Sequence, residues 1–239
     1  KHALAAAAQA QLAGFDGNMA ADRAAPLIYW AWQRQLARAI FRDDVSAALW
    51  DRSLATRSFQ DALQGALDRN DTTWCDDRST PAAETCAEQS STALARALDE
   101  LQQRFGTDVA AWQWGRAHQM RSEHRPFSRV KLLAPWFELR TPVGGDTHTV
   151  NVSRVGLRPD VSTGELYLDE HGPSLRALYD VANPAQSRVI HSTGQSGIVF
   201  SPLYRSFVQA WGAVQYVPLW PAAAAGEVLV VKPGAQTAP

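Results

Sequence analysis

The hydrophobic pattern of the chain changes near residue 125. Before this point, apolar residues recur at spacings of three and four, as on one face of a helix; Phe59, Leu63 and Leu67, each four apart, are an example. After it, short segments rich in β-branched residues alternate with residues that favour turns. Helices that precede strands, rather than alternate with them, predict an α+β fold with a helical first half and mostly antiparallel strands.

Two parts are therefore expected, residues 1–125 mainly helical and residues 126–239 mainly β. Pro26 suits the first turn of a helix, and Gly106 suits the end of another. Further helices are expected in the alanine-rich start, which no capping residue precedes, after Asp44 and around Leu63. The expected strands are residues 149–152, 175–181, 187–190 and 227–231, with a short helix at residues 204–211.

Composition excludes several classes of protein. With 23 Lys and Arg against 24 Asp and Glu, the formal net charge is -1, so no nucleic-acid partner is expected. No stretch approaches the about 18 uninterrupted apolar residues of a membrane-spanning helix, so no membrane partner is expected. A hydrophobic content of 46% can offset the entropy lost on ordering, which excludes intrinsic disorder.

Cys75 and Cys86 are the only cysteines in the sequence. No neighbouring Cys or His completes a tetrahedral set, so no structural metal site is expected. A disulfide would close a short polar loop and would require an oxidising compartment, whereas two free buried thiols are the alternative. Because the two cysteines flank the loop and have no other partner, the disulfide is favoured.

Short motifs alone do not disclose an activity. The sequence contains no Gly-x-Ser-x-Gly elbow, no phosphate-binding loop, no dinucleotide fingerprint and no His-Glu-x-x-His helix. His118 and His124 are too far apart to share a helical turn, and each is interpreted as a hydrogen-bonded structural residue. Gln195 and Ser196, which glycines flank, are interpreted as turn residues.

Several short segments between residues 15 and about 205 are informative as an ordered set. They are Phe15-Asp16-Gly17-Asn18-Met19, Pro26-Leu27-Ile28 with Trp32, Trp74-Cys75-Asp76-Asp77 with Cys86, Trp112-Gln113-Trp114-Gly115-Arg116-Ala117-His118, Gly145-Asp146 to Thr149-Val150-Asn151, Gly172-Pro173-Ser174-Leu175-Arg176, and Gly194-Gln195-Ser196-Gly197 with Ser201-Pro202-Leu203-Tyr204. In order and spacing the set resembles the penicillin acylase family, most closely its N-acyl-homoserine lactone and aculeacin A acylases. Phe15 stands where the family usually has Trp, a conservative change.

The resemblance implies a periplasmic or secreted bacterial amidase, made as a zymogen and cut into α and β chains. The implied fold is that of N-terminal nucleophile hydrolases, four αββα layers with two sheets between helices. The family nucleophile is the serine that begins the β chain, whereas this chain begins with Lys1. The chain therefore resembles the C-terminal part of a β chain, a fragment of one larger domain that the α chain and the N-terminal part of the β chain complete.

The resemblance assigns an oxyanion donor to Asn151. The family's serine attacks an amide carbonyl with its own α-amino group as base, and the resulting oxyanion needs hydrogen-bond donors. One donor in the family is a side-chain amide on a late strand, and the Thr149-Val150-Asn151 match places it at Asn151. Without the resemblance, Asn151 would be interpreted as a strand-end residue that satisfies a turn.

The resemblance also assigns Arg176 to the site. The family has an arginine some two dozen residues beyond the oxyanion Asn, close to the N-terminal amine, where its charge would favour the neutral base. A surface arginine on a strand is the alternative interpretation of Arg176. Some family members bind calcium, but its carboxylate ligands are not assigned to residues here, so no cofactor is expected.

The expected activity is hydrolysis of linear amides (EC 3.5.1 type), in complex with the chain that carries the serine. N-acyl-homoserine lactones are the first expected small-molecule substrates, which implies quorum quenching, and penicillin-type amides, linked to antibiotic resistance, are the second. The alternative is a non-catalytic binding or structural chain on the same scaffold. Without its partner chains, the helical half is expected to expose an apolar set: Trp30, Trp32, Phe41, Trp50 and Phe59.

Overall fold

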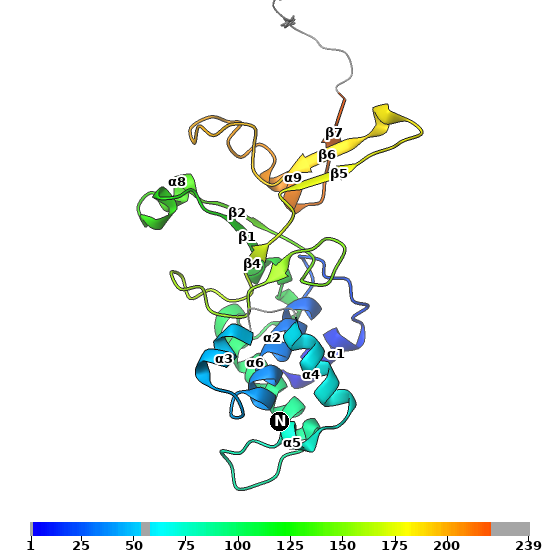
Figure 1. Cartoon of the computed structure of the whole chain (residues 1–239), viewed down its shortest axis with the longest axis vertical. Coiled ribbons are helices and arrows are strands. Elements are labelled where there is room, and N and C mark those ends of the chain that lie inside the picture. Colours follow the sequence, from blue (N-terminus) through cyan, green and yellow to red (C-terminus); the bar gives the residue numbers. More distant parts are fainter. Residues whose placement is uncertain (1, 54–57, 221–239) are drawn as a thin grey trace, which may run out of the picture.

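The computed structural model describes residues 2–53 and 58–220. Figure 1 shows helices α1 to α6 gathered at one end of the molecule and strands β5, β6 and β7 at the other. The helices are α1 Ala5–Ala13, α2 Ala25–Phe41, α3 Ala47–Ser53, α4 Ser58–Asp68, α5 Thr72–Cys75, α6 Cys86–Phe105, α7 Trp114–Ala117, α8 Ala134–Phe137 and α9 Val208–Gly212. Short 3-10 turns are η1 Val109–Ala111, η2 Phe127–Arg129 and η3 Pro184–Gln186.

Helices α2 and α6 form the centre of the helical part. Pro26 lies in the first turn of α2, where a backbone N–H would have no intrahelical partner. Helix α6 begins with a capping box in which the Thr85 hydroxyl accepts from the Glu88 amide and the Glu88 carboxylate accepts from the Thr85 amide. The main hydrophobic core is built mostly from the buried faces of these two helices: Leu27, Ile28, Trp30, Leu36, Ile40, Ala93, Ala97, Leu98 and Leu101.

A disulfide joins Cys75, the last residue of α5, to Cys86, the first residue of α6. Both cysteines are buried and belong to the main core. The predicted disulfide is therefore confirmed, and the alternative of two free thiols is wrong.

In the described part of the chain the strands form two sheets. The first has the order β2-β1-β4-β3, in which only the β1–β4 pair is parallel, and the second has the antiparallel order β5-β6-β7. In the second sheet, Leu175 lies opposite His191 and Leu178 opposite Arg188. The strands are β1 Gln119–Ser122, β2 Leu139–Pro142, β3 Arg154–Val155, β4 Asp169–His171, β5 Leu175–Leu178, β6 Arg188–His191 and β7 Val217–Pro218.

A second, smaller core connects the two sheets. Helix α9 contacts both β2 and β6, and its Trp211 is almost completely buried. Met120, Leu139 and Ile190 supply the strand side chains of this core. In the opposite direction, Val155, Leu157, Leu166 and Tyr167 pack into the main helical core. The first sheet therefore contacts the main helical core through the residues near β3 and β4, and α9 through β1 and β2.

The α+β prediction is confirmed, because the long helices precede mostly antiparallel strands. Helices α1 to α4 and α6 lie where they were expected, as do β5 and β6. The expected short helix is present as α9, and the strand expected at residues 227–231 lies outside the described residues.

Two predictions are wrong, one about a strand and one about the exposure of apolar side chains. Residues 149–152 form no strand, because the Asp146 carboxylate accepts from the amides of His148 and Thr149 and closes a turn instead. Val150, which a sheet would cover, is fully exposed. The apolar set expected to be exposed is also largely covered: Trp30 and Phe59 are buried in the core, and Trp32, Phe41 and Trp50 pack against it.

Candidate active site

Asn151 lines an open pocket of about 740 Å³ that brings together segments distant in sequence. One wall is the Gly17–Asp22 segment, the second is the loop after β2, and the third is the chain that leaves α9. The residues that line the pocket are Gly17, Asn18, Met19, Ala20, Ala21, Asp22, Gly144, Gly145, Thr149, Val150, Asn151, Gly212, Ala213 and Val214. Two of the segments on which the family resemblance rests therefore meet at this pocket.

The loop that carries Asn151 is held by its own side chains. Asp146 is buried, and its Oδ1 accepts from the amides of His148 and Thr149 at 2.8 and 2.9 Å. The Thr149 hydroxyl accepts from the Asp146 amide at 2.8 Å and is 3.1 Å from the Asn151 carbonyl, to which it can donate. These short-range bonds satisfy backbone groups that a strand would pair with a neighbouring strand.

The Asn151 side chain is half-buried, and its amide orientation is determined by a carbonyl. Nδ2 donates to the Gly144 carbonyl at 3.2 Å, and because a carbonyl only accepts, the nitrogen must face it. A primary amide has two N–H donors, so the second remains for a ligand in the pocket. The Asn151 Oδ1 is buried and has no hydrogen-bond partner among the described residues, which leaves an acceptor for a donor from another segment.

Gly145 is required where it lies, next to Asn151. Its φ is +85°, a left-handed conformation that favours glycine. A Cβ at this position would collide with the Asn151 carbonyl oxygen. The Gly145 amide donates to the Met19 carbonyl at 2.8 Å, which joins the loop to the opposite pocket wall. A side chain here would therefore displace the proposed donor.

Arg176 lies on β5, outside the lining of this pocket. Its guanidinium lies over the Trp211 ring, 4.3 Å from the centroid, and donates to the Trp211 carbonyl at 2.7 Å. Burial lowers the pKa of Arg176, while the nearby Asp169 charge raises it. Trp211 directly precedes Gly212 of the pocket wall, so Arg176 supports that wall through Trp211 without lining the pocket.

Asp169, at the start of β4, is a buried carboxyl that sequence analysis did not identify. Its Oδ1 accepts from the His171 amide at 3.0 Å, and its Oδ2 has no partner among the described residues. Burial raises the pKa of Asp169, and the hydrogen bond from the His171 amide opposes this shift. Asp169 is followed by Glu170 and His171 and belongs to no recognisable motif, so the sequence gave no signal for this position.

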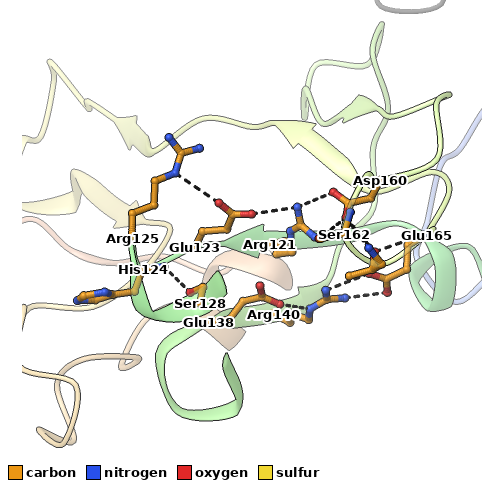
Figure 2. A network of polar contacts seen from close by, with 11 residues as sticks. Arg121, Glu123, His124, Arg125, Ser128, Glu138, Arg140, Asp160, Ser162 and Glu165 are labelled. Atoms are coloured by element: carbon orange, nitrogen blue, oxygen red, sulfur yellow. Dashed lines mark hydrogen bonds and ion pairs between the residues drawn. The ribbon is translucent and has the colours of Figure 1, made fainter. Parts of the chain in front are cut away.

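A second pocket of about 700 Å³ lies beside the β1–β2 hairpin and contains a charged network. Figure 2 shows Arg121 between Glu123 and Asp160, and Arg140 between Glu138 and Glu165. The hydrogen bond from Arg121 holds the pKa of Asp160 well below its usual range, and the bond with Glu165 raises the pKa of Arg140. These charges pair with one another and fasten the residue 156–165 loop to the hairpin, which indicates a structural role.

Two further findings concern the described residues alone. None of their helices combines the length and the apolar character that a membrane-spanning segment requires. Within residues 2–53 and 58–220, no group of three or more His, Cys, Asp or Glu side chains is arranged to hold a metal ion.

Comparison with known proteins identifies the family. The penicillin amidase family model matches residues 1–226. Acyl-homoserine lactone acylase QuiP of Pseudomonas aeruginosa is 28% identical over 224 residues, which cover 87% of this chain and 26% of that protein. The QuiP acylase of Pseudomonas putida is 29% identical over 223 residues, covering 88% and 26%. The chain thus spans about a quarter of the length of the curated relatives it matches.

A solved structure is also similar. Thermostable penicillin G acylase from Alcaligenes faecalis superimposes with a TM-score of 0.49 at 15% identity, covering 95% of this chain and 43% of that chain. Since the family model matches residues 1–226 and the relatives cover 87% and 88% of the chain, the resemblance inferred from the ordered segments is confirmed. The chain belongs to the penicillin amidase family.

Proposed function

We propose that this chain is the C-terminal part of the β chain of an acylase and that Asn151 donates to the oxyanion of the reaction. The observation that carries the proposal is the second N–H of the Asn151 amide, which no described residue occupies and which lies on a pocket wall. An amide is a suitable donor because it stabilises negative charge without carrying a charge itself.

In the proposed reaction the nucleophile comes from the β-chain segment that precedes this one. The serine oxygen attacks the amide carbonyl carbon while the α-amino group of that serine takes the hydroxyl proton. The carbonyl oxygen becomes an oxyanion and accepts a hydrogen bond from Asn151. The proton is then given to the leaving amine as the C–N bond breaks, and water hydrolyses the acyl-serine ester. Every proton in this sequence moves between groups of the enzyme, substrate and water, so we propose that no cofactor is needed.

Arg176 is proposed to act indirectly. Its contacts with Trp211 support the wall that ends at Gly212, and its positive charge would favour the neutral form of a nearby amine. The second effect requires the N-terminal segment of the β chain to pack beside this wall.

The proposed substrates are N-acyl-homoserine lactones, with penicillin-type amides as a second class. The first class is supported by the names of the curated relatives, all acyl-homoserine lactone acylases, and would make the enzyme quorum-quenching. The second would link it to antibiotic resistance. A periplasmic or secreted location is supported by the disulfide.

The proposed partners are the α chain and the N-terminal part of the β chain, released from one precursor. Residues 1–125 and 126–239 would together complete one larger αββα domain with these chains. The precursor would be an inactive zymogen, and cleavage before the serine would convert it into the active enzyme.

The test is Asn151→Ala in the complete precursor. We expect kcat to fall by about 10² to 10³, because the donor acts on charge that develops only in the transition state. KM should change much less, since the ground-state carbonyl carries little negative charge. The control is Asn183→Ala, which removes an exposed asparagine from the turn of the β5–β6 hairpin. Fatty-acid release from acyl-homoserine lactones, followed by liquid chromatography, measures both constants.

Two outcomes would contradict the proposal. If Asn151→Ala melts normally and hydrolyses its substrate at the parental rate, Asn151 is no oxyanion donor. If the complete purified precursor yields no chain that begins with Ser by mass analysis, and releases no acyl group, the alternative of a non-catalytic binding or structural chain holds.

A further inference from the structure

His118 is the most buried histidine of the described chain and lies directly after α7. Its exposed fraction is 0%, and its ring stacks on Trp114 with centroids 4.3 Å apart and ring planes 12° apart. Helix α7 is itself held in place, because the amides of Trp114 and Gly115 donate to the Arg23 and Ala21 carbonyls. The stacked pair is thus attached, through α7, to the Gly17–Asp22 wall of the pocket.

The hydrogen bonds of His118 determine its tautomer. Nδ1 lies 2.6 Å from the Tyr167 carbonyl, which can only accept, so Nδ1 carries the proton. Burial lowers the pKa of His118 to about 4, so the ring is neutral at working pH and Nε2 is an acceptor. The Ser153 hydroxyl, 2.7 Å away, therefore donates to Nε2.

Trp114 and His118 hold the two ends of the loop that carries Asn151. At the first end, Trp114 Nε1 donates to the Gly145 carbonyl at 3.0 Å. At the second, His118 binds the Ser153 hydroxyl, and the Ser153 amide donates to the Asp146 carbonyl at 2.9 Å. Ser153 is 2% exposed and lies two residues beyond Asn151.

We propose that the stacked Trp114–His118 pair positions the oxyanion donor. By holding Gly145 and Ser153 through hydrogen bonds, the pair fixes the position and orientation of the Asn151 amide in the pocket. This inference rests on the proposed role of Asn151. Trp114, His118 and Ser153 are positioning residues, because they act through the loop and line no part of the pocket.

The test is Ser153→Ala in the complete, processed enzyme. The substitution removes the hydroxyl that donates to His118 Nε2 and does not remove the backbone hydrogen bond from the Ser153 amide to the Asp146 carbonyl. We expect kcat to fall about 10-fold with KM within about twofold, because a small displacement of a donor costs transition-state stabilisation. The matched control is Ser187→Ala, at another buried serine, whose hydroxyl accepts from the Asp180 amide in the β5–β6 hairpin. This control should keep the parental kcat even if its melting temperature falls as far as that of Ser153→Ala.

A double substitution separates positioning from mere support of the fold. In the Asn151→Ala background, Ser153→Ala should lower kcat no further, since the residue through which it acts is already absent. Additive losses in kcat, or a Ser153→Ala enzyme with parental kcat beside an impaired Asn151→Ala enzyme, would overturn the inference alone. A parental rate for Asn151→Ala would instead overturn the proposed function.

Ser153→Cys covers the case in which Ser153→Ala yields no folded enzyme. Cysteine has a slightly larger side chain than serine and offers a weaker donor. We expect its kcat to lie between those of the parent and of Asn151→Ala, and a parental kcat would again overturn the inference.

Discussion

At the scale of single residues, His118 connects α7 to the loop that carries Asn151, and its protonation makes the stability of the fold depend on pH. Its imidazole is neutral in the folded protein because burial lowers its pKa to about 4, against 6.5 for an exposed histidine. Between these two pH values the unfolded chain binds a proton that the folded chain does not, so the free energy of unfolding falls as pH falls. Below pH 4 His118 is protonated in both the folded and the unfolded chain, so its contribution to the free energy of unfolding falls no further.

We therefore expect the protein to lose stability between pH 6.5 and pH 4, by about 3 kcal/mol from this residue. Asp169 acts in the opposite sense, because burial raises its pKa and the folded state keeps a proton that the unfolded state releases. Urea unfolding midpoints at pH 7 and pH 4.5 measure the net change. His118→Asn, which cannot titrate in this range, should show a smaller loss; equal losses in parent and variant would assign the pH dependence to other groups.

At the scale of elements, a disulfide and a helix-capping box both stabilise the junction of α5 and α6. The disulfide attaches the first residue of α6 to the end of α5, and the Thr85–Glu88 capping box satisfies orphan amides at the same helix end. Helix α6 is the main partner of α2 in the core, so this junction determines how the longest helix enters the core.

Replacing Cys75 and Cys86 together by Ala should lower the free energy of unfolding by roughly 3 kcal/mol, because the unfolded chain regains the freedom that an 11-residue link removes. The activity of the folded fraction should not change, since neither cysteine lines the pocket. Thiol titration of the denatured, unreduced parent should find no free thiol. Two titratable thiols would show that the protein folds without this bond.

At the scale of the whole molecule, the two ends differ in how well they are covered. The helical end packs most of its large apolar side chains into or against the main core, whereas apolar side chains on and near β5, β6 and β7 are exposed. These strands lie at the opposite end of the molecule from the helices (Figure 1). Val181 is 94% exposed and Phe200 83%. The other large apolar residues exposed near this end are Leu175, Leu178, Tyr179, Ile198, Leu203 and Trp220.

We expect residues 1–239 expressed alone to self-associate and to bind a hydrophobic dye, because an exposed apolar set of this kind is typical of an interface. Co-expression with the preceding precursor segments should give a soluble complex with weak dye binding. Replacing Val181, Ile198 and Phe200 by Ser should reduce dye binding by the lone chain, while Trp30→Phe in the helical core should not. A parent chain that remains monomeric and binds no dye would contradict this expectation.

Local patterns were sufficient for much of the fold. Helical spacing, Pro26, Gly106 and the paired cysteines act within one or two turns, so α2, α4, α6 and the disulfide could be predicted. Strands β1, β2 and β4 were missed because each has few residues, and their pairing partners are distant in sequence. Residues 149–152 have strand composition but follow Asp146, whose side chain competes successfully for their amides.

For the candidate site, the ordered segments pointed to Asn151 and Arg176, whose roles stay predictions, because each lies in a short segment that resembles the family. The surroundings of these residues could not be inferred this way. That His118 binds Ser153, that Trp114 binds Gly145, and that Arg176 lies on Trp211 depends on contacts between segments separated by more than 30 residues. Such contacts have no local signature, since they are selected by the packing of α7, α9 and the loop after β2 against two separate cores.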